Sequence, residues 1–167
     1  MLKHTEPQTL RCWLNASAGA QAKRATLSAE ARAALDVQLF DAAKTGNAAA
    51  IERLAAEGAS PNAKKGGCPA VVRAVDNGHA GAVSALVRLG AGLDARDSAG
   101  WAALMYAAWR GLLECARALL AGGADRTLRA TGGWSKGKTV LETAESSTTV
   151  QSLYMYGKAE VAALLPE

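Results

Sequence analysis

Apolar residues recur three and four positions apart in two short stretches of this chain, residues 51–55 and 83–87. This spacing places the apolar side chains along one face of an α-helix. Each stretch is soon followed by a glycine, Gly58 or Gly90, which can take the left-handed conformation that closes a helix and turns the chain. Polar or turn-forming residues come next. The pattern therefore predicts short helices separated by turns.

The same pattern returns at a fixed spacing. Segments 41–59, 73–91 and 106–124 align with one another, and four sets of residues keep one phase, 32 and 33 residues apart. The four sets are Gly46, Gly78 and Gly111; Gly58, Gly90 and Gly123; Leu54, Leu86 and Leu119; and Ala42, Ala74 and Ala107. A period of this length indicates a repeat protein in which each unit is a pair of helices. Because neither helix can bury its apolar face alone, we expect the units to stack.

The third unit carries the clearest sequence signature. Residues 97–104 read DSAGWAAL, which resembles the D-x-x-G-x-T-P-L opening of the ankyrin repeat, and the Gly-His step of that family occurs at Gly78 and His79. The resemblance covers residues 28–167, although the Thr-Pro-Leu-His core is eroded, for example to AALM at residues 102–105. It implies an all-α ankyrin-repeat solenoid of about four degenerate helix-turn-helix units, with short finger loops and an enlarged last unit.

The ends of the array are expected to differ from its middle, because a terminal unit lacks one neighbour. Ser28 can cap an elongated first helix that has Glu30 in its first turn and runs to Lys44. At the other end, the connection over residues 128–139 is lengthened by about four residues, and residues 145–156 delay the last helix.

Residues 1–27 are predicted to be a basic tail in front of the repeat domain at residues 28–167. The tail holds four bases and one acid, a net charge of +3 out of the +4 of the whole chain. Its stretch between Glu6 and Glu30 contains no acid, as in organellar transit peptides. A disordered tail and an arm that docks on a partner fit the same composition, so all three interpretations stay open.

The cysteines and the hydropathy pattern bear on the cellular compartment. Three cysteines are widely spaced, with no CxxC pair, which favours a reducing intracellular compartment. The longest uncharged stretch near the centre, residues 98–109, is too short to cross a bilayer. We therefore expect a cytoplasmic protein without a membrane partner, with a mitochondrion or plastid as the alternative that the tail suggests.

One segment matches a phosphate-binding pattern. Residues 132–139 read GGWSKGKT and fit G-x-x-x-x-G-K-T. Such a loop needs a buried strand before it and a metal-holding aspartate on a later strand. Residues 127–130 do not read as a buried strand, and only 28 residues follow Thr139. A nucleotide site is therefore disfavoured, and Lys136 and Lys138 are kept as residues that could contact an anion.

Two tryptophans are the strongest candidates for contacting a partner. On the ankyrin resemblance, Trp101 belongs to a finger, and Trp109 lies at the solvent-facing end of the adjoining first helix, beside Arg110. Tryptophan and arginine are enriched among residues that dominate binding energies. Alternatively, both tryptophans merely cover the alanine-rich surface beside them. The predicted partner-binding set is Trp101, Trp109, Arg110, Ser98, Arg96, Lys65, Asp76, Asn77 and Trp134.

Basic residues outnumber acids along the predicted finger edge. Seven lysines and arginines there face three acids, Asp94, Asp97 and Asp125. An acidic protein surface would suit such an edge, as would RNA within a larger particle. A simply solvated edge is equally compatible, because exposed charge is the norm.

The sequence offers no constellation for catalysis. It shows no paired carboxylates and no nucleophile near a histidine, and its histidines are His4 and His79. No catalytic residue, metal, cofactor or small-molecule substrate is therefore predicted, and His79 is expected to brace a helix–helix turn. The predicted function is a non-catalytic protein-protein interaction module, an adaptor or small subunit of a larger assembly, that binds through a concave face of fingers and first helices. An accessory protein of an RNA-containing particle is the alternative.

Overall fold

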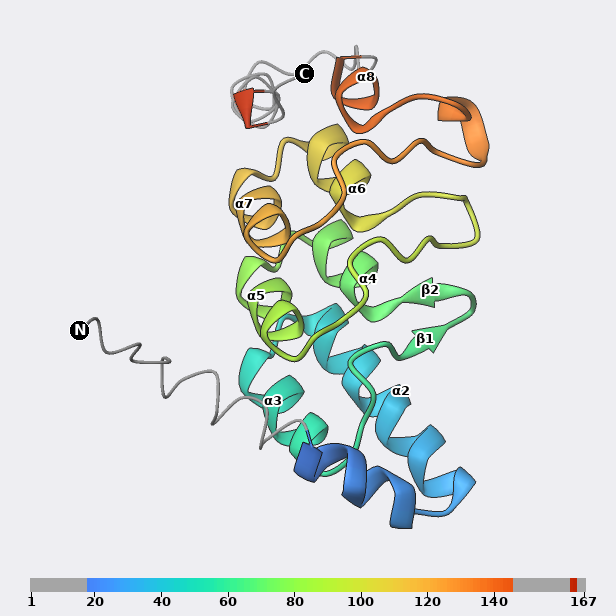
Figure 1. Ribbon diagram of the computed structural model, residues 1–167, viewed down its shortest axis with the longest axis vertical. Helices are drawn as coiled ribbons and strands as arrows, with labels where there is room; N and C mark the ends of the chain where they lie inside the picture. The colour runs from blue at the N-terminus through green and yellow to red at the C-terminus, as the bar shows by residue number, and fades with distance from the viewer. Residues whose placement is uncertain (1–17, 146–162, 165–167) are drawn as a thin grey trace, which may run out of the picture.

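The computed structural model describes residues 18–145 and 163–164. Helix pairs stack along one axis, and finger loops project to one side (Figure 1). The helices next to the fingers form an inner row, and their partners form an outer row. The inner helices are α2 (Ala29–Thr45), α4 (Ala70–Asp76), α6 (Ala103–Arg110) and α8 (Val140–Glu145), and the outer helices are α3 (Ala48–Ala56), α5 (Ala80–Arg88) and α7 (Leu113–Ala121). The predicted all-α solenoid of stacked helix pairs is confirmed.

The core consists of small and medium side chains at the repeating positions. Two of the repeating sets are buried. They are Ala42, Ala74 and Ala107 on the inner helices and Leu54, Leu86 and Leu119 on the outer helices. Alanine lets successive inner helices approach closely, and the leucines fill the space between inner and outer rows. The sequence period is therefore the period of the core.

The turn inside a helix pair depends on glycine. Gly46 follows α2 with a φ of 79°, a left-handed conformation that side chains rarely adopt. A Cβ atom at Gly46 would also lie 2.7 Å from the ring of His79 in the next unit. His79 Nε2 lies 3.1 Å from the carbonyl oxygen of Lys44. Gly46 therefore turns the chain and makes room for the neighbouring unit, and His79 braces this turn as expected.

Short antiparallel pairing forms the base of each finger. The first finger contains the paired strands β1 (Lys64–Lys65) and β2 (Cys68–Pro69). Single bridges close the next two fingers over residues 96–102 and 129–139. The last finger is longer, as predicted, and contains a 3-10 turn at Gly133–Ser135. The second expected insertion, residues 145–156, lies outside the described residues except for its first position.

A hydrogen bond of one kind links each outer turn to the next. Asn62 Oδ1 accepts a hydrogen bond from the backbone N–H of Gly92 at 2.7 Å. One unit later, Asp94 Oδ1 accepts from the backbone N–H of Asp125 at 2.9 Å. Asn62 and Asp94 lie 32 residues apart, at the same place in their units. Each side chain therefore fixes the position of the following turn.

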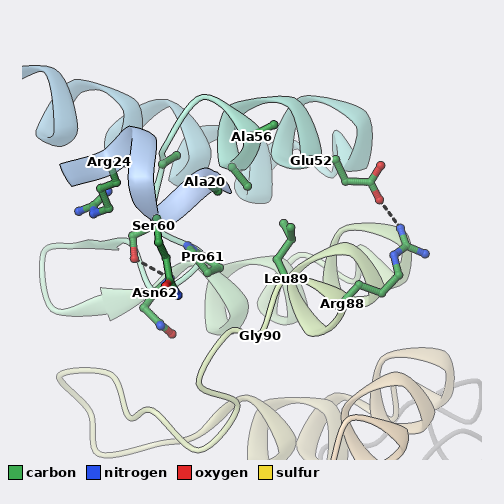
Figure 2. A pocket seen from close by; sticks show the side chains of 13 residues that line it. Ala20, Arg24, Glu52, Ala56, Ser60, Pro61, Asn62, Arg88, Leu89 and Gly90 are labelled. Atoms are coloured by element: carbon green, nitrogen blue, oxygen red, sulfur yellow. Dashed lines mark hydrogen bonds and ion pairs between the residues drawn. The ribbon is translucent and has the colours of Figure 1, made fainter. Parts of the chain in front are cut away.

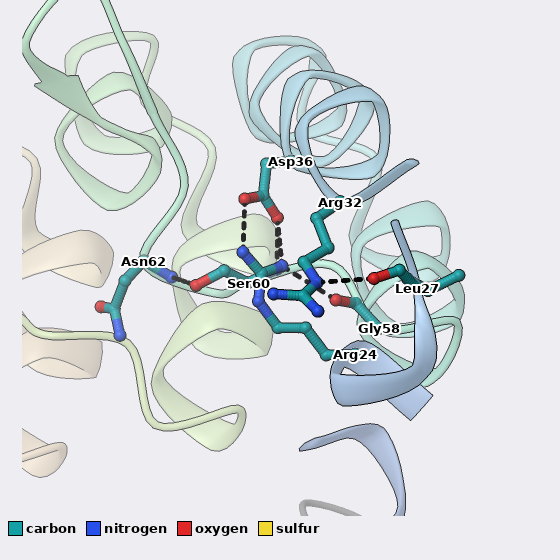
Figure 3. A network of polar contacts seen from close by, with 7 residues as sticks. All are labelled: Arg24, Leu27, Arg32, Asp36, Gly58, Ser60 and Asn62. Atoms are coloured by element: carbon teal, nitrogen blue, oxygen red, sulfur yellow. Dashed lines mark hydrogen bonds and ion pairs between the residues drawn. The ribbon is translucent and has the colours of Figure 1, made fainter. Parts of the chain in front are cut away.

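The first unit has no preceding turn, and Asp36 of α2 takes its role (Figure 3). Asp36 Oδ1 accepts a hydrogen bond of 2.7 Å from the backbone N–H of Ser60, the counterpart of Gly92 one unit earlier. Arg24 donates to both oxygens of Asp36, at 2.7 and 2.8 Å, and to the carbonyl oxygen of Gly58 at 2.9 Å. Residues 18–26 are helical. This part of the expected basic tail therefore contacts the first unit through Arg24.

The long first helix begins and ends close to its predicted bounds. Ser28 caps α2 by accepting a hydrogen bond of 3.2 Å from the backbone N–H of Ala31. Glu30 lies in the first turn, where the helix dipole favours a negative charge, and the helix ends at Thr45.

The Asp36 carboxylate is electrostatically stabilised. Burial alone raises the pKa of Asp36, but the hydrogen bonds from Arg24 and Ser60 and the charge of Arg24 outweigh it, so that the pKa lies below its usual value. A carboxyl whose pKa is lowered by folding stabilises the fold at neutral pH. That contribution is lost as the pH falls through the folded-state pKa.

Replacing Asp36 with asparagine should destabilise the protein, because an amide has one acceptor oxygen and no charge. The hydrogen bond from Arg24 to Oδ2 and the ion pair are lost, and an amide N–H2 would face the guanidinium instead. We expect Asp36→Asn to lower the free energy of unfolding in urea at pH 7 by about 2 kcal/mol. The difference from the wild type should begin to shrink below about pH 4, where the carboxyl of the unfolded chain becomes protonated, and should disappear as the pH falls through the lowered folded-state pKa of Asp36. The control is Asp41→Asn, which breaks an exposed ion pair with Lys65 and should cost less than about 1 kcal/mol. Equal losses in the two variants would contradict the assigned role of Asp36.

Candidate functional site

Trp101 lies inside the protein, not on its surface. Its side chain is 4% exposed and packs in a tilted arrangement on Tyr106, with ring centroids 5.0 Å apart. A Cβ atom built on Gly133 of the last finger would lie 3.7 Å from Trp101 Nε1, so the last finger covers this tryptophan. The expectation that Trp101 offers surface to a partner does not fit this burial. Trp101 instead contacts the ring of Trp109 from the interior of the protein.

Trp109 is half-buried on α6 and contacts Trp101 and Arg110. The ring of Trp101 meets that of Trp109 edge to face at 5.9 Å, and the guanidinium of Arg110 lies 5.5 Å from the Trp109 ring centroid. Arg110 also forms an ion pair of 2.8 Å with Asp76 of α4, whose other oxygen accepts from Arg73 at 3.2 Å. Trp109, Arg110 and Asp76 are named the Trp109 patch below. The Arg110 side chain remains 43% exposed, so it can still contact a partner.

The finger beside the Trp109 patch is tied to α6. Asp97 Oδ1 accepts hydrogen bonds from the backbone N–H groups of Ala99 and Trp101, at 2.9 and 3.0 Å. Its other oxygen accepts from the hydroxyl of Tyr106 at 2.7 Å. Burial and this hydrogen bond raise the pKa of Tyr106 well above its usual value, so the hydroxyl stays a donor. The sequence showed Asp97 as the first residue of the ankyrin-like signature, but gave no sign that Tyr106 would contact it.

The remaining predicted residues do not gather at the Trp109 patch. Lys65 pairs with Asp41 at 3.0 Å, and Asn77 donates to the carbonyl oxygen of Lys44 at 2.8 Å, which joins two units. Arg96 donates to the carbonyl oxygen of Arg129 at 2.9 Å and thereby bridges two fingers. The exposed residue Ser98 belongs to the finger turn. The side chain of Trp134 is outside the described part of the structure.

The glycine-rich loop is the extended last finger, and its backbone is already hydrogen-bonded. The N–H groups of Gly137 and Lys138 each donate at 2.8 Å to carbonyl oxygens within the finger. Thr139 precedes α8 and forms a reciprocal cap with Glu142. The Thr139 N–H donates to Glu142 Oε2 at 2.6 Å, and its hydroxyl oxygen accepts from the Glu142 N–H at 3.2 Å. The N–H groups of Gly137, Lys138 and Thr139 and the Thr139 hydroxyl oxygen, which a nucleotide loop would turn toward phosphate and magnesium, are therefore engaged in the fold.

Several bases of the fingers and inner helices have acidic neighbours. Arg129 lies 3.6 Å from Glu142, and Asp76 pairs with both Arg73 and Arg110. Asp76 therefore balances part of the positive charge beside Trp109, and Glu142 does the same for Arg129 at the last finger. An anion contact at Lys136 and Lys138 remains a prediction.

The described residues show little basis for metal or thiol chemistry. Within residues 18–145 and 163–164, His, Cys, Asp and Glu side chains form no group of three that could hold a metal ion, and no helix is long and apolar enough to span a membrane. Burial, with a smaller contribution from Glu114, raises the pKa of the Cys115 thiol to about 11. Burial also raises the pKa of Cys68. Both thiols therefore stay protonated and unreactive near neutral pH.

If residues 132–139 serve as a finger and helix cap, Thr139→Ala should affect stability and not ligand binding. We expect a loss of about 1 kcal/mol in the free energy of unfolding, typical of a lost N-cap. Titration calorimetry with ATP and magnesium should show no saturable binding to either protein. Thr131→Ala, which removes a weaker hydrogen bond of 3.4 Å, is the control and should cost less. Micromolar ATP binding that Lys138→Ala abolishes would overturn this interpretation.

Comparison with known protein families matches residues 39–130 to ankyrin repeats, in three copies. Among curated proteins no match is found. The match covers more than half of the chain and coincides with the stacked units that carry the Trp109 patch. Ankyrin repeats are generally non-enzymatic modules for protein–protein interaction. The chain belongs to the ankyrin repeat family.

Proposed function

We propose that this chain is a non-catalytic adaptor, or a small subunit of a larger assembly, that binds another protein through its fingers and inner helices. The observation that carries the proposal is the Trp109 patch. It combines a partly exposed tryptophan with a stacked, ion-paired arginine, the residue types that most often dominate protein interfaces.

Preorganisation supports this assignment. The Trp109 ring rests on the buried Trp101, and Arg110 is held by Asp76 on the neighbouring inner helix. Side chains that are already ordered lose little conformational entropy when a partner binds. The Asp97–Tyr106 hydrogen bond likewise fixes the adjoining finger against α6. The patch therefore presents a rigid surface.

The patch also suggests the chemistry of the partner. An apolar or aromatic side chain would pack on Trp109, and a carboxylate next to it would accept charge-assisted hydrogen bonds from the exposed side of Arg110. The partner we propose is thus a protein surface with an apolar anchor flanked by an acid. Because Asp76 already neutralises part of the local positive charge, shape and apolar contact should contribute more than long-range attraction.

Affinity capture from native extract, followed by titration with the purified retained protein, tests the proposed surface. Trp109→Ala should weaken binding by about thirtyfold, which corresponds to the loss of a hot-spot residue worth about 2 kcal/mol. Arg117→Ala is the matched control, because it removes an exposed, ion-paired arginine from outer helix α7. Circular dichroism should show that both variants are folded. Unchanged affinity in folded Trp109→Ala would remove the patch from the interface.

The salt dependence of the same interaction separates a protein partner from RNA. For the protein partner, we expect the affinity to fall less than about tenfold between 50 and 200 mM salt. A contact with six to ten phosphates loses roughly three to five orders of magnitude over that range. The measurement is the dissociation constant at four salt concentrations. A slope as steep as that of nucleic-acid binding would favour the RNA-particle alternative.

A further inference from the structure

A groove of about 440 Å³ lies on the outer-helix side, between the first and second units (Figure 2). Its walls come from the helix at residues 18–26, from α3, from the turn after α3 and from the end of α5. The walls are largely apolar, with Ala55, Ala56 and Leu89 among them. Glu52 and Arg88 form an ion pair at one end of the groove. This volume is large enough for two or three apolar side chains.

The next junction along the array is packed differently. Between the second and third units, Val87 and Leu93 pack against Gly122, where a Cβ atom would lie 2.5 and 2.9 Å from their side chains. The residues that correspond to Val87 and Leu93 one unit earlier are Ala55 and Pro61. The counterpart of Gly122 is Leu89, so at the first junction the large side chain stands on the opposite wall, and it lines the groove.

The chain itself holds apolar residues at the spacing needed to cover this groove. Ala18 is already helical, and Ala20, Gln21 and Arg24 of the same helix line the groove. Residues seven positions apart share one face of a helix, because seven residues make almost two turns. Seven positions before Ala20 and Gln21 stand Trp13 and Leu14. Leu10 stands on the same face, one further turn toward the N-terminus.

We propose that residues 10–14 dock into this groove, with Leu10, Trp13 and Leu14 against the apolar walls of α3 and α5. Figure 2 supports the direction: from Arg24 to Ala20 the helix leads toward the part of the groove where Leu89, Glu52 and Arg88 lie. Residues before Ala20 thus enter the groove if the helix simply continues.

Tethering favours this occupant over a separate molecule. Trp13 is seven residues from Ala20, which lines the groove, so its side chain is held near the groove at an effective concentration in the millimolar range. A tryptophan and two leucines also carry much more apolar surface than the alanines they would cover. The docked segment would lie on the outer-helix side and leave the Trp109 patch uncovered. The inference is therefore independent of the proposed partner surface.

Cys12 provides a natural probe for docking, because it adjoins Trp13 and the other two cysteines, Cys68 and Cys115, are buried. In the full chain at neutral pH, alkylation of Cys12 by iodoacetamide is followed by mass spectrometry of the peptide that contains it. We expect Cys12 of the wild type to react at least about tenfold more slowly than Cys12 of Trp13→Ala, after each rate is divided by the rate in urea.

A second variant obstructs the groove without touching the tail. Ala56 is exposed on α3, and its counterpart in the next unit is Arg88, so this register of the repeat tolerates arginine. Ala56→Arg should speed Cys12 alkylation to the Trp13→Ala rate. The matched control is Ala121→Arg, at the same register on α7 and outside the lining of the groove, which should react like the wild type. Equal rates in all four proteins, or protection that Ala56→Arg leaves intact, would overturn the proposal.

Discussion

The fold depends on the close approach of successive units, none of which can bury its apolar faces alone. Small residues permit this approach: Ala74 and Ala107 are fully buried between inner helices, and Gly46 leaves room for the ring of His79. Larger side chains at these positions would push the units apart and expose the leucines behind them. Close packing also aligns polar groups across each junction, so that Asn62 and Asp94 reach the next turn. The apolar packing and the hydrogen bonds between successive turns therefore have the same cause, the close approach of the units.

The same constraint shapes the first unit. Without a preceding neighbour, the N–H of Ser60 would lack the acceptor that equivalent residues have, and Asp36 supplies it from a different helix. Arg24 then compensates the partly buried charge of Asp36 and brings residues 18–26 against the array. This helix is shorter than a full unit and does not fill the junction behind α3. The cap and the groove beside it thus follow from the same substitution of a single helix for a helix pair.

The sequence predicted the repeating part of the structure well because each repeating residue does the same task in every unit. Helices, turns and buried alanines follow from local spacing and could be located without coordinates. Asp36 could not, since it lies 24 residues before Ser60, whereas Asn62 and Asp94 lie 30 and 31 residues before their partners. The burial of Trp101 was missed for a related reason. It depends on the lengthened last finger, which departs from the repeat and whose path the spacing does not specify.

Burial changes the role of Trp101 without weakening the case for binding at Trp109. A tryptophan exposed alone on a helix end would sample several orientations, and a partner would have to order it. Here Trp101 supports the Trp109 ring from below, while Asp76 holds Arg110 beside it. The finger that covers Trp101 is the enlarged one, so the element that distinguishes the last unit also stabilises the surface of the third. The part of this array that departs from the repeat is therefore the contact between the enlarged last finger and α6. Binding of a partner protein should be sought there.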